Sequence, residues 1–264
     1  MKKFYALILG ASSGFGKSIS LALAKDGVNI IGVHLDRSST MPDVEQLIED
    51  IKAYGVEARF YNVNAADSGK RKMIIDETAE LFKNNPEAEI KVMLHSLAFG
   101  TLKPFIADDP MQEMNQKNIE MTLDVMANSF IYWTQDIVRN NLMKSGGKIY
   151  CMTSSGGRKQ IESYGAISAA KACLESYTRQ LSMELASKGI AVNALMAGVT
   201  DTPALRKIPG TDKIINNALQ RNHHGRLTQT TDVADFILDN YKNNSSWFTG
   251  NIVNLDGGES VVEL

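Results

Sequence analysis

A glycine-rich turn close to the N-terminus limits the folds open to this chain. An apolar run over residues 4–9 leads directly into the sequence Gly10-Ala-Ser-Ser-Gly14-Phe-Gly16, and apolar residues at helical spacing continue over 18–26. Glycines allow a tight turn and let backbone N–H groups approach a pyrophosphate at the start of a helix. The order of strand, turn and helix therefore predicts a dinucleotide-binding unit, with contacts from Gly10, Ser12, Ser13, Gly14, Phe15 and Gly16.

The rest of the chain alternates between strand-length apolar runs and helical patterns. The predicted strands lie near residues 4–9, 28–35, 58–63, 89–95, 147–153, 190–196 and 250–255. The predicted helices lie near residues 18–26, 44–54, 70–82, 111–143, 169–186 and 232–241. Buried strands that alternate with helices pair in parallel through right-handed crossovers. We therefore predict the α/β class, with a single doubly wound Rossmann-type domain over 1–264 and a seven-stranded parallel sheet that has helices on both faces.

One segment interrupts this alternation. Residues 203–230 contain Pro203, Pro209 and Gly210 and separate the sixth strand from the last helix. An insertion after the carboxyl end of a strand lies where such sheets bind ligands, so we expect a substrate lid. Basic residues outnumber acidic residues in this segment, and the basic residues are Arg206, Lys207, Lys213, Arg221 and Arg226. This excess predicts either electrostatic steering of an acidic acyl carrier or a solvated helix face.

Composition excludes several functional classes. A formal charge of −2 and a pI near 6.1 argue against a nucleic-acid partner, which normally requires a clustered basic excess. Cys151 and Cys173 are the two cysteines, which suits a reducing, cytoplasmic location and makes a disulfide framework improbable. We expect no metal site, because the adjacent His223 and His224 have no carboxylate or cysteine at ligand spacing. No run of about 18 apolar residues is present, so no membrane span is expected.

The spacing of the glycine turn resembles that of the short-chain dehydrogenase/reductase family, and other motifs extend the resemblance through nearly the whole chain. The stretch "YNVNAAD" is similar to the family's adenine-side segment and implicates Asn62 and Val63. The stretch "VNALMAGVTDT" looks like the family's nicotinamide-side turn and implies contacts from Gly198, Val199 and Thr202. The stretch "FTGNIVNLDGG" matches the family's last strand. The resemblance implies a nicotinamide cofactor and a homotetramer.

The tip of the second predicted strand bears on the choice of cofactor. An acid at this place favours NAD through the ribose 2′-hydroxyl, whereas a nearby arginine accommodates the phosphate of NADP. Here Asp36 lies two positions beyond the family's usual acid, and Arg37 follows it. We expect NADPH, with NADH possible, and the alternative is that both residues form a solvated turn.

The catalytic positions depart from the family's usual carbonyl-reducing pattern. That pattern places a tyrosine four residues before a lysine, but Ile167 stands four residues before Lys171. The helical asparagine that commonly supports a proton relay corresponds to Met126. The spacing of Tyr164 and Lys171, with six residues between them, instead resembles the enoyl-[acyl-carrier-protein] reductase branch, and the compact glycine turn resembles the bacterial third type.

Two further stretches support this branch. The turn "LHSLAFG" is similar to that of the branch and places Ser96 at the cofactor, and "MAGVTDT" lacks the proline usual elsewhere in the family. In an enoyl thioester, hydride adds to C3 while charge develops on the thioester oxygen. Tyr164 would stabilise or protonate that enolate, and Lys171 would fix the cofactor ribose and favour ionisation of the phenol. Ser154 would either touch the substrate or serve the turn at a strand end.

The resemblance thus implies NADPH-dependent reduction of the C2=C3 double bond of an enoyl thioester on acyl carrier protein or coenzyme A. One alternative is a short-chain carbonyl reductase, for example of 3-ketoacyl groups, which uses Tyr164 in an unusual position. A second alternative is a non-catalytic, NADP-binding redox sensor. We expect His95, at the end of the fourth predicted strand, to be structural rather than an acid or base.

Overall fold

A single parallel sheet forms the centre of the protein. The computed structural model describes residues 3–263. Its strand order is β3-β2-β1-β4-β5-β6-β7, and every neighbouring pair is parallel. The strands span Lys3–Leu9 (β1), Asn29–His34 (β2), Ala58–Asn62 (β3), Ala88–His95 (β4), Lys148–Thr153 (β5), Ala191–Ala197 (β6) and Ile252–Leu255 (β7). The prediction of a doubly wound seven-stranded sheet is confirmed.

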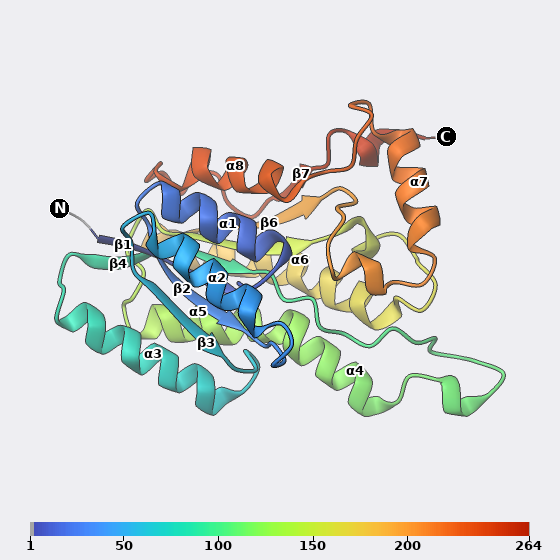
Figure 1. Cartoon of the computed structure of the whole chain (residues 1–264), viewed down its shortest axis with the longest axis horizontal. Helices are drawn as coiled ribbons and strands as arrows, with labels where there is room; N and C mark the ends of the chain where they lie inside the picture. The colour runs from blue at the N-terminus through green and yellow to red at the C-terminus, as the bar shows by residue number, and fades with distance from the viewer. Residues whose placement is uncertain (1–2, 264) are drawn as a thin grey trace.

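Helices cover both faces of the sheet (Figure 1). On one face lie α1 (Gly14–Lys25), α2 (Met41–Lys52) and α8 (Thr230–Tyr241). On the other face lie α3 (Ser68–Lys83), α5 (Ser129–Arg139) and α6 (Gly165–Leu185). The remaining α-helices are α4 (Gln116–Leu123), which packs against α6, and α7 (Thr211–Arg221).

The alternation of side chains along a strand explains why the apolar runs are continuous. In β1, Tyr5, Leu7 and Leu9 enter the core under α3, α5 and α6. The intervening Ala6 and Ile8 enter the core under α1, α2 and α8. A strand buried on both faces requires apolar residues at every position, as parallel sheets do. No helix among residues 3–263 is long and apolar enough to cross a membrane.

Two predicted segments differ from the structure in detail. The helical pattern over 111–143 resolves into a 3₁₀ turn at Pro110–Gln112 (η1), α4, a π-helical stretch at Asp124–Asn128 (η2) and α5. The segment 203–230 contains a 3₁₀ turn at Leu205–Lys207 (η5) and the unpredicted helix α7, which lies beside the C-terminal residues in Figure 1.

Candidate active site

The glycine turn lies at the point where strand order reverses, between β1 and its neighbours β2 and β4. Gly10 has a φ of +88°, and a Cβ there would lie 2.5 Å from the carbonyl oxygen of Ser96. A Cβ on Gly16 would lie 2.0 Å from the carbonyl oxygen of Gly10. One on Gly14, whose φ is +53°, would lie 3.7 Å from Cγ2 of Thr202. The structure therefore brings five predicted cofactor contacts together at the ligand-binding edge of the sheet.

The neighbouring residues of the turn have different surroundings. Ser13 is exposed and precedes α1 in extended conformation, where its hydroxyl makes no capping hydrogen bond. Phe15 packs partly against the core under α1, α2 and α8. The aromatic ring of Phe15 thus has a structural role, whereas the backbone of the turn faces the crevice expected to receive a pyrophosphate.

Hydrogen bonds hold the tip of β2 in place. The Asp36 N–H donates to Oδ1 of Asn62 (2.9 Å), and Nδ2 of Asn62 donates to the Asp36 carbonyl oxygen (3.0 Å). The Asp36 carboxylate lies 2.9 Å from Nδ1 of His34 and accepts a 2.9 Å hydrogen bond from the Thr40 hydroxyl. Burial raises the Asp36 pKa, but hydrogen bonds from Ser12, Thr40 and His34 outweigh it and leave the pKa lowered. Asn62 therefore supports the tip of β2, and Asp36 is ionised at neutral pH.

Arg37 differs from Asp36 in its accessibility. Its side chain is exposed, and no ion pair joins it to any residue in 3–263. Its carbonyl oxygen accepts hydrogen bonds from the backbone and hydroxyl of Thr40. Val63, the other predicted adenine-side contact, donates its N–H to the carbonyl oxygen of His34 (2.8 Å). Arg37 is thus the accessible charged side chain at this tip.

The turn after β6 is tightly packed. A Cβ on Gly198 would lie 2.4 Å from Oγ1 of Thr228, so only glycine fits there. The Val199 N–H donates to Oε2 of Glu259 (3.0 Å), and its carbonyl oxygen accepts from Thr228 N–H (3.1 Å). Thr202 accepts a 3.2 Å hydrogen bond from the Leu205 N–H on its hydroxyl. Sequence reasoning missed Glu259, which lies just beyond the recognised "LDGG" stretch.

Tyr164 stands at the N-terminal boundary of α6 and is 8% exposed. A Cβ on Gly156 would lie 2.7 Å from Cε1 of Tyr164 and 3.2 Å from Oγ of Ser154, so both side chains converge on this glycine. Ser154 Oγ is buried and has no hydrogen-bond partner among residues 3–263. Burial raises the pKa of Tyr164, and the nearby Ser154 hydroxyl only partly offsets that rise. The phenol is therefore protonated at neutral pH.

Lys171 lies two turns further along α6 and is buried. Its Nζ donates a 2.7 Å hydrogen bond to the carbonyl oxygen of Met152, at the end of β5. Burial lowers the pKa of Lys171 to about 8. Lys171 is not among the groups that shift the pKa of Tyr164, which burial raises, so its expected effect on the phenol stays a prediction.

Apolar packing fills the place of the usual proton donor. A Cβ on Gly100 would lie 2.8 Å from Cγ1 of Ile167, 2.8 Å from Cγ2 of Thr122 and 3.0 Å from Sδ of Met126. Ile167 and Met126 are both buried. These residues form a closed apolar wall at the position four residues before Lys171, and the wall offers no acidic proton.

His95, at the end of β4, is almost completely buried. Its Nε2 is 2.8 Å from Oγ of Ser129, which donates to the Val125 carbonyl oxygen within the π-helical stretch (2.8 Å). Burial, assisted by the charge of Lys171, lowers the pKa of His95 to about 3. The neutral imidazole therefore anchors the start of α5, as a structural histidine would.

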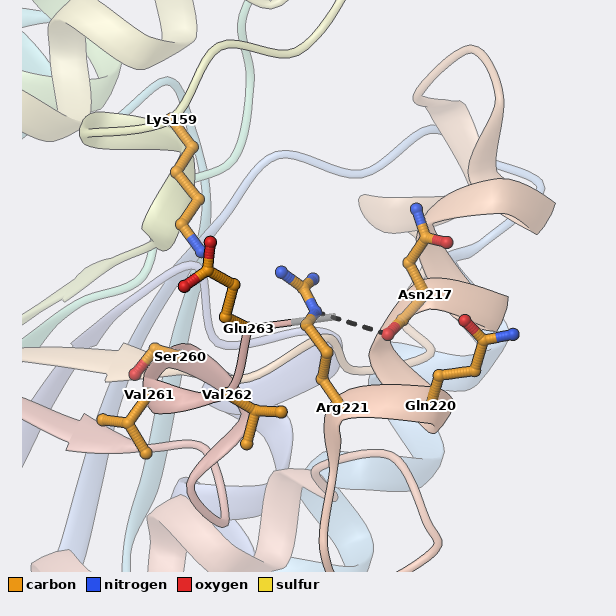
Figure 2. Close-up of a pocket in the computed structure, with 8 residues that line it drawn as sticks. All are labelled: Lys159, Asn217, Gln220, Arg221, Ser260, Val261, Val262 and Glu263. Atoms are coloured by element: carbon orange, nitrogen blue, oxygen red, sulfur yellow. Dashed lines mark hydrogen bonds between the residues drawn. The ribbon is translucent and has the colours of Figure 1, made fainter.

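A cavity of about 620 Å³ lies between the loop after β5, α7 and the C-terminal residues (Figure 2). It is lined by Lys159, Asn217, Gln220, Arg221, Ser260, Val261, Val262 and Glu263. Ion pairs largely neutralise the basic excess predicted for residues 203–230. Arg206 pairs with Asp201, Arg221 with Glu259 and Arg226 with Asp232. No cluster of three potential metal-ligating side chains occurs within residues 3–263.

Comparisons with known proteins identify the family of this chain. The family model described as enoyl-(acyl carrier protein) reductase matches residues 10–260. The 2-dehydro-3-deoxy-D-gluconate 5-dehydrogenase of Bacillus subtilis is 28% identical over 96% of this chain and 93% of that protein. The 3-oxoacyl-[acyl-carrier-protein] reductase of Staphylococcus epidermidis is 26% identical over 96% of this chain and 97% of that protein.

Solved structures show the same fold. The enoyl-[acyl-carrier-protein] reductase (NADH) of Aquifex aeolicus superposes on this chain with a TM-score of 0.79 at 21% identity. The superposition covers 100% of this chain and 98% of that chain. Enoyl and 3-oxoacyl reductases thus both occur among the similar proteins. The chain belongs to the short-chain dehydrogenase/reductase family of oxidoreductases, in the group that the enoyl-(acyl carrier protein) reductase model describes.

Proposed function

We propose that the protein is an NADPH-dependent enoyl thioester reductase. The observation that carries this proposal is the apolar wall of Gly100, Met126 and Ile167, which occupies the usual site of the carbonyl-reducing tyrosine. The remaining phenol, Tyr164, lies two turns before Lys171 and beside Ser154. This arrangement suits a substrate whose developing charge lies further from the nicotinamide than a ketone oxygen would.

The residues at the crevice fit a dinucleotide. The turn at residues 10–16 has no space for Cβ atoms at Gly10 and Gly16, so the chain passes closely between β1 and the start of α1. The N–H groups of Gly10 and Ala11 donate to the Val33 carbonyl oxygen, and the N–H groups at the start of α1 would bind the phosphates. Lys171 would hold the nicotinamide ribose, and the Gly198–Thr202 turn would border the nicotinamide. Arg37 supports NADPH, because it is an exposed cation beside Asp36, whose oxygens already accept hydrogen bonds from the protein.

The bound dinucleotide would supply a hydride, which forms the new C3–H bond of the substrate. As this bond forms, the π electrons of C2=C3 would form a new bond between C1 and C2, and the π electrons of the thioester C=O would move onto its oxygen to give an enolate. Tyr164 donates a hydrogen bond to that oxygen, and its raised pKa keeps the O–H intact for the purpose. When the enolate collapses back to the thioester, C2 would take one proton from solvent to form the C2–H bond, so the product gains one hydride and one proton. Ser154 Oγ, which lacks a fully formed hydrogen bond in residues 3–263, is available to the same oxygen.

The assembly and acyl carrier form part of the proposal. We propose a homotetramer in a reducing cytoplasm, with the acyl group carried on acyl carrier protein or coenzyme A. Both cysteines are free thiols, which agrees with a reducing location. The segment 203–230 would act as the substrate lid, because α7 lies at the ligand-binding edge beside the cavity of Figure 2.

Replacement of Tyr164 by phenylalanine tests the assignment. With crotonyl-coenzyme A and NADPH, we expect Tyr164→Phe to lower turnover by about 100-fold or more, because the thioester oxygen loses its donor. The dissociation constant for NADPH should stay within about twofold of the parent. NADPH oxidation is followed by absorbance, and the assay is repeated with NADH and with acetoacetyl-coenzyme A.

A second tyrosine on the same helix serves as the control. Tyr177 donates a 2.9 Å hydrogen bond to Oδ1 of Asn128, so Tyr177→Phe removes a comparable hydroxyl away from the proposed chemistry. It should keep the parent turnover. If Tyr164→Phe reduced crotonyl-coenzyme A at the parent rate, the assignment of Tyr164 would be wrong. Activity of the parent with acetoacetyl-coenzyme A alone would identify a carbonyl reductase, and NADPH binding without turnover would favour a sensor.

A further inference from the structure

Glu259 is a buried carboxylate that no recognised motif includes. It begins the 3₁₀ turn Glu259–Val261 (η6) after β7 and is 6% exposed. Its Oε2 accepts the Val199 N–H at 3.0 Å, and its Oε1 lies 3.7 Å from Nη2 of Arg221. One carboxylate therefore joins the turn after β6 to the last residue of α7.

The surroundings of Glu259 make this connection rigid. The Asp256 carboxylate accepts hydrogen bonds from Gly258 N–H and Ser260 N–H, both at 3.0 Å, and so fixes the turn that bears Glu259. Asn222, adjacent to α7, donates from Nδ2 to the Asp256 carbonyl oxygen (3.1 Å). The C-terminal turn is thus attached to the end of α7 independently of the ion pair.

The packing at Gly198 shows how closely the carboxylate approaches the other segment. A Cβ on Gly198 would lie 2.9 Å from Oε2 of Glu259, so the side chain touches the turn as well as bonding it. The other partner, Arg221, extends from α7 towards the C-terminal residues at the rim of the cavity (Figure 2). It is also fixed by a hydrogen bond from Nε to the Asn217 carbonyl oxygen (3.3 Å).

We propose that Glu259 is a positioning residue that couples the Gly198–Thr202 turn to α7. A carboxylate makes a stronger hydrogen bond to a backbone N–H than a neutral acceptor does. Its second oxygen transmits the position of the turn to Arg221. Occupation of the dinucleotide site, which this inference takes from the proposed function, would then order the segment 203–230, and an ordered segment would in turn strengthen dinucleotide binding.

Three single variants, one double variant and one control variant test the coupling. Glu259→Ala removes both contacts, and Glu259→Gln keeps an acceptor for Val199 but loses the charge. Arg221→Gln removes the ion pair, together with the Arg221 hydrogen bond to Asn217, and leaves the Val199 contact in place. The matched control is Arg139→Gln, because Arg139 pairs with Asp136 at a similar 3.8 Å on α5. Dissociation constants for NADPH and NADH are measured separately by cofactor fluorescence, and circular dichroism and thermal midpoints establish that each variant is folded.

The expected results differ between the variants. Glu259→Ala should weaken dinucleotide binding about tenfold, since a backbone donor loses a charged acceptor. Glu259→Gln should restore affinity to within about threefold of the parent, because its amide oxygen still accepts. Arg221→Gln combined with Glu259→Gln should bind no more weakly than either single variant, as expected for one shared interaction. Arg139→Gln should match the parent.

Limited trypsin digestion reports on the segment itself, which contains Arg206, Lys207 and Lys213. Saturating dinucleotide should slow cleavage there in the parent, and Glu259→Gln should lose that protection although it still binds. A folded Glu259→Ala that binds within about twofold of the parent, or equal protection in the parent and in Glu259→Gln, would overturn the proposal. Neither readout needs an enoyl substrate, so this result stays interpretable if the proposed reaction fails. Failure of the coupling would likewise leave the test of the proposed reaction unaffected.

Discussion

At the scale of single residues, Lys171 links the site to pH. Burial lowers its pKa to about 8 from the ordinary 10.5. Below pH 8 both folded and unfolded chains are protonated, so the folded state bears the full cost of the buried charge. Between about pH 8 and about pH 10.5 the unfolded chain binds more protons, and the free energy of unfolding therefore rises with pH.

Lys171→Met should remove this dependence. From about pH 7 to about pH 10, the free energy of unfolding of the parent should rise by about 2 to 3 kcal/mol relative to that of the variant. Any stability advantage of the variant at pH 7 therefore shrinks by that amount. Urea unfolding at the two pH values measures the difference. Lys52→Met, at an exposed residue of α2, is the control and should show no such trend. A difference that is constant with pH would contradict the prediction.

The sequence was a better guide to which residues lie at the site than to the surroundings of each side chain. Lys171 could be assigned to a helix because helical spacing is a local property, but the predicted helix began at residue 169, whereas α6 begins at Gly165 with Tyr164 immediately before it. The pKa of Tyr164 could not be predicted, because it depends on Gly156 and Ser154, which reach the phenol from a different segment. Glu259 was missed for the same reason, since its partners Val199 and Arg221 are distant in the chain.

At the scale of elements, the start of α6 contains local strain. Ser163 has a φ of +58°, in the left-handed region that favours glycine and asparagine. The Tyr164 N–H donates to the Ile161 carbonyl oxygen (3.1 Å), and the Tyr164 carbonyl oxygen accepts from Ser168 N–H (2.8 Å). The conformation of Ser163 therefore sets the direction from which Tyr164 enters the site.

Substitution at Ser163 tests this geometry. Ser163→Val should lower the free energy of unfolding by about 1 to 2 kcal/mol, because a β-branched residue is disfavoured in the left-handed region. It should also slow crotonyl-coenzyme A reduction by moving Tyr164. Ser163→Asn, which tolerates the same φ, should resemble the parent in both urea unfolding and turnover. Equal behaviour of the two variants would show that this turn does not position the phenol.

Helix boundaries were harder to predict than the presence of helices. The π-helical stretch at Asp124–Asn128 lies inside a long apolar pattern, and one extra residue per turn does not interrupt that pattern detectably. The helix α7 lies in a segment rich in polar residues, with a single fully buried position at Ala218. Its position depends on contacts with the C-terminal turn, which local patterning does not encode.

At the scale of the whole molecule, the alternation of buried strands and helices was sufficient to predict the sheet. Right-handed crossovers leave few possible strand orders, and the glycine turn places the order reversal at β1. The same topology leaves β7 at one edge, with β6 as its single partner in the sheet. Alternation does not predict whether another subunit covers this edge, because such a contact would depend on the surfaces of two chains.

The residues around β7 favour a subunit contact at this edge. Trp247 is 95% exposed in the loop before β7, and Phe248 next to it is 46% exposed. The loop lies against α6, since a Cβ on Gly250 would be 2.8 Å from Oγ of Ser182. Met183, the next residue of α6, is also exposed. Apolar side chains gathered beside an edge strand are typical of surfaces that a second copy covers.

Replacement of Trp247 tests whether this surface holds the expected homotetramer together. We expect Trp247→Ser to raise the dissociation constant of the assembly by about tenfold or more, because a buried tryptophan contributes strongly to interfaces. Light scattering after size-exclusion chromatography, over a series of protein concentrations, measures the mass. Tyr54→Ser is the control, because Tyr54 is exposed and lies between α2 and β3, the strand at the opposite edge of the sheet from β7. A variant that retains the parent mass at every concentration would place the subunit contact elsewhere, whereas a parent that is monomeric throughout would contradict the tetramer itself.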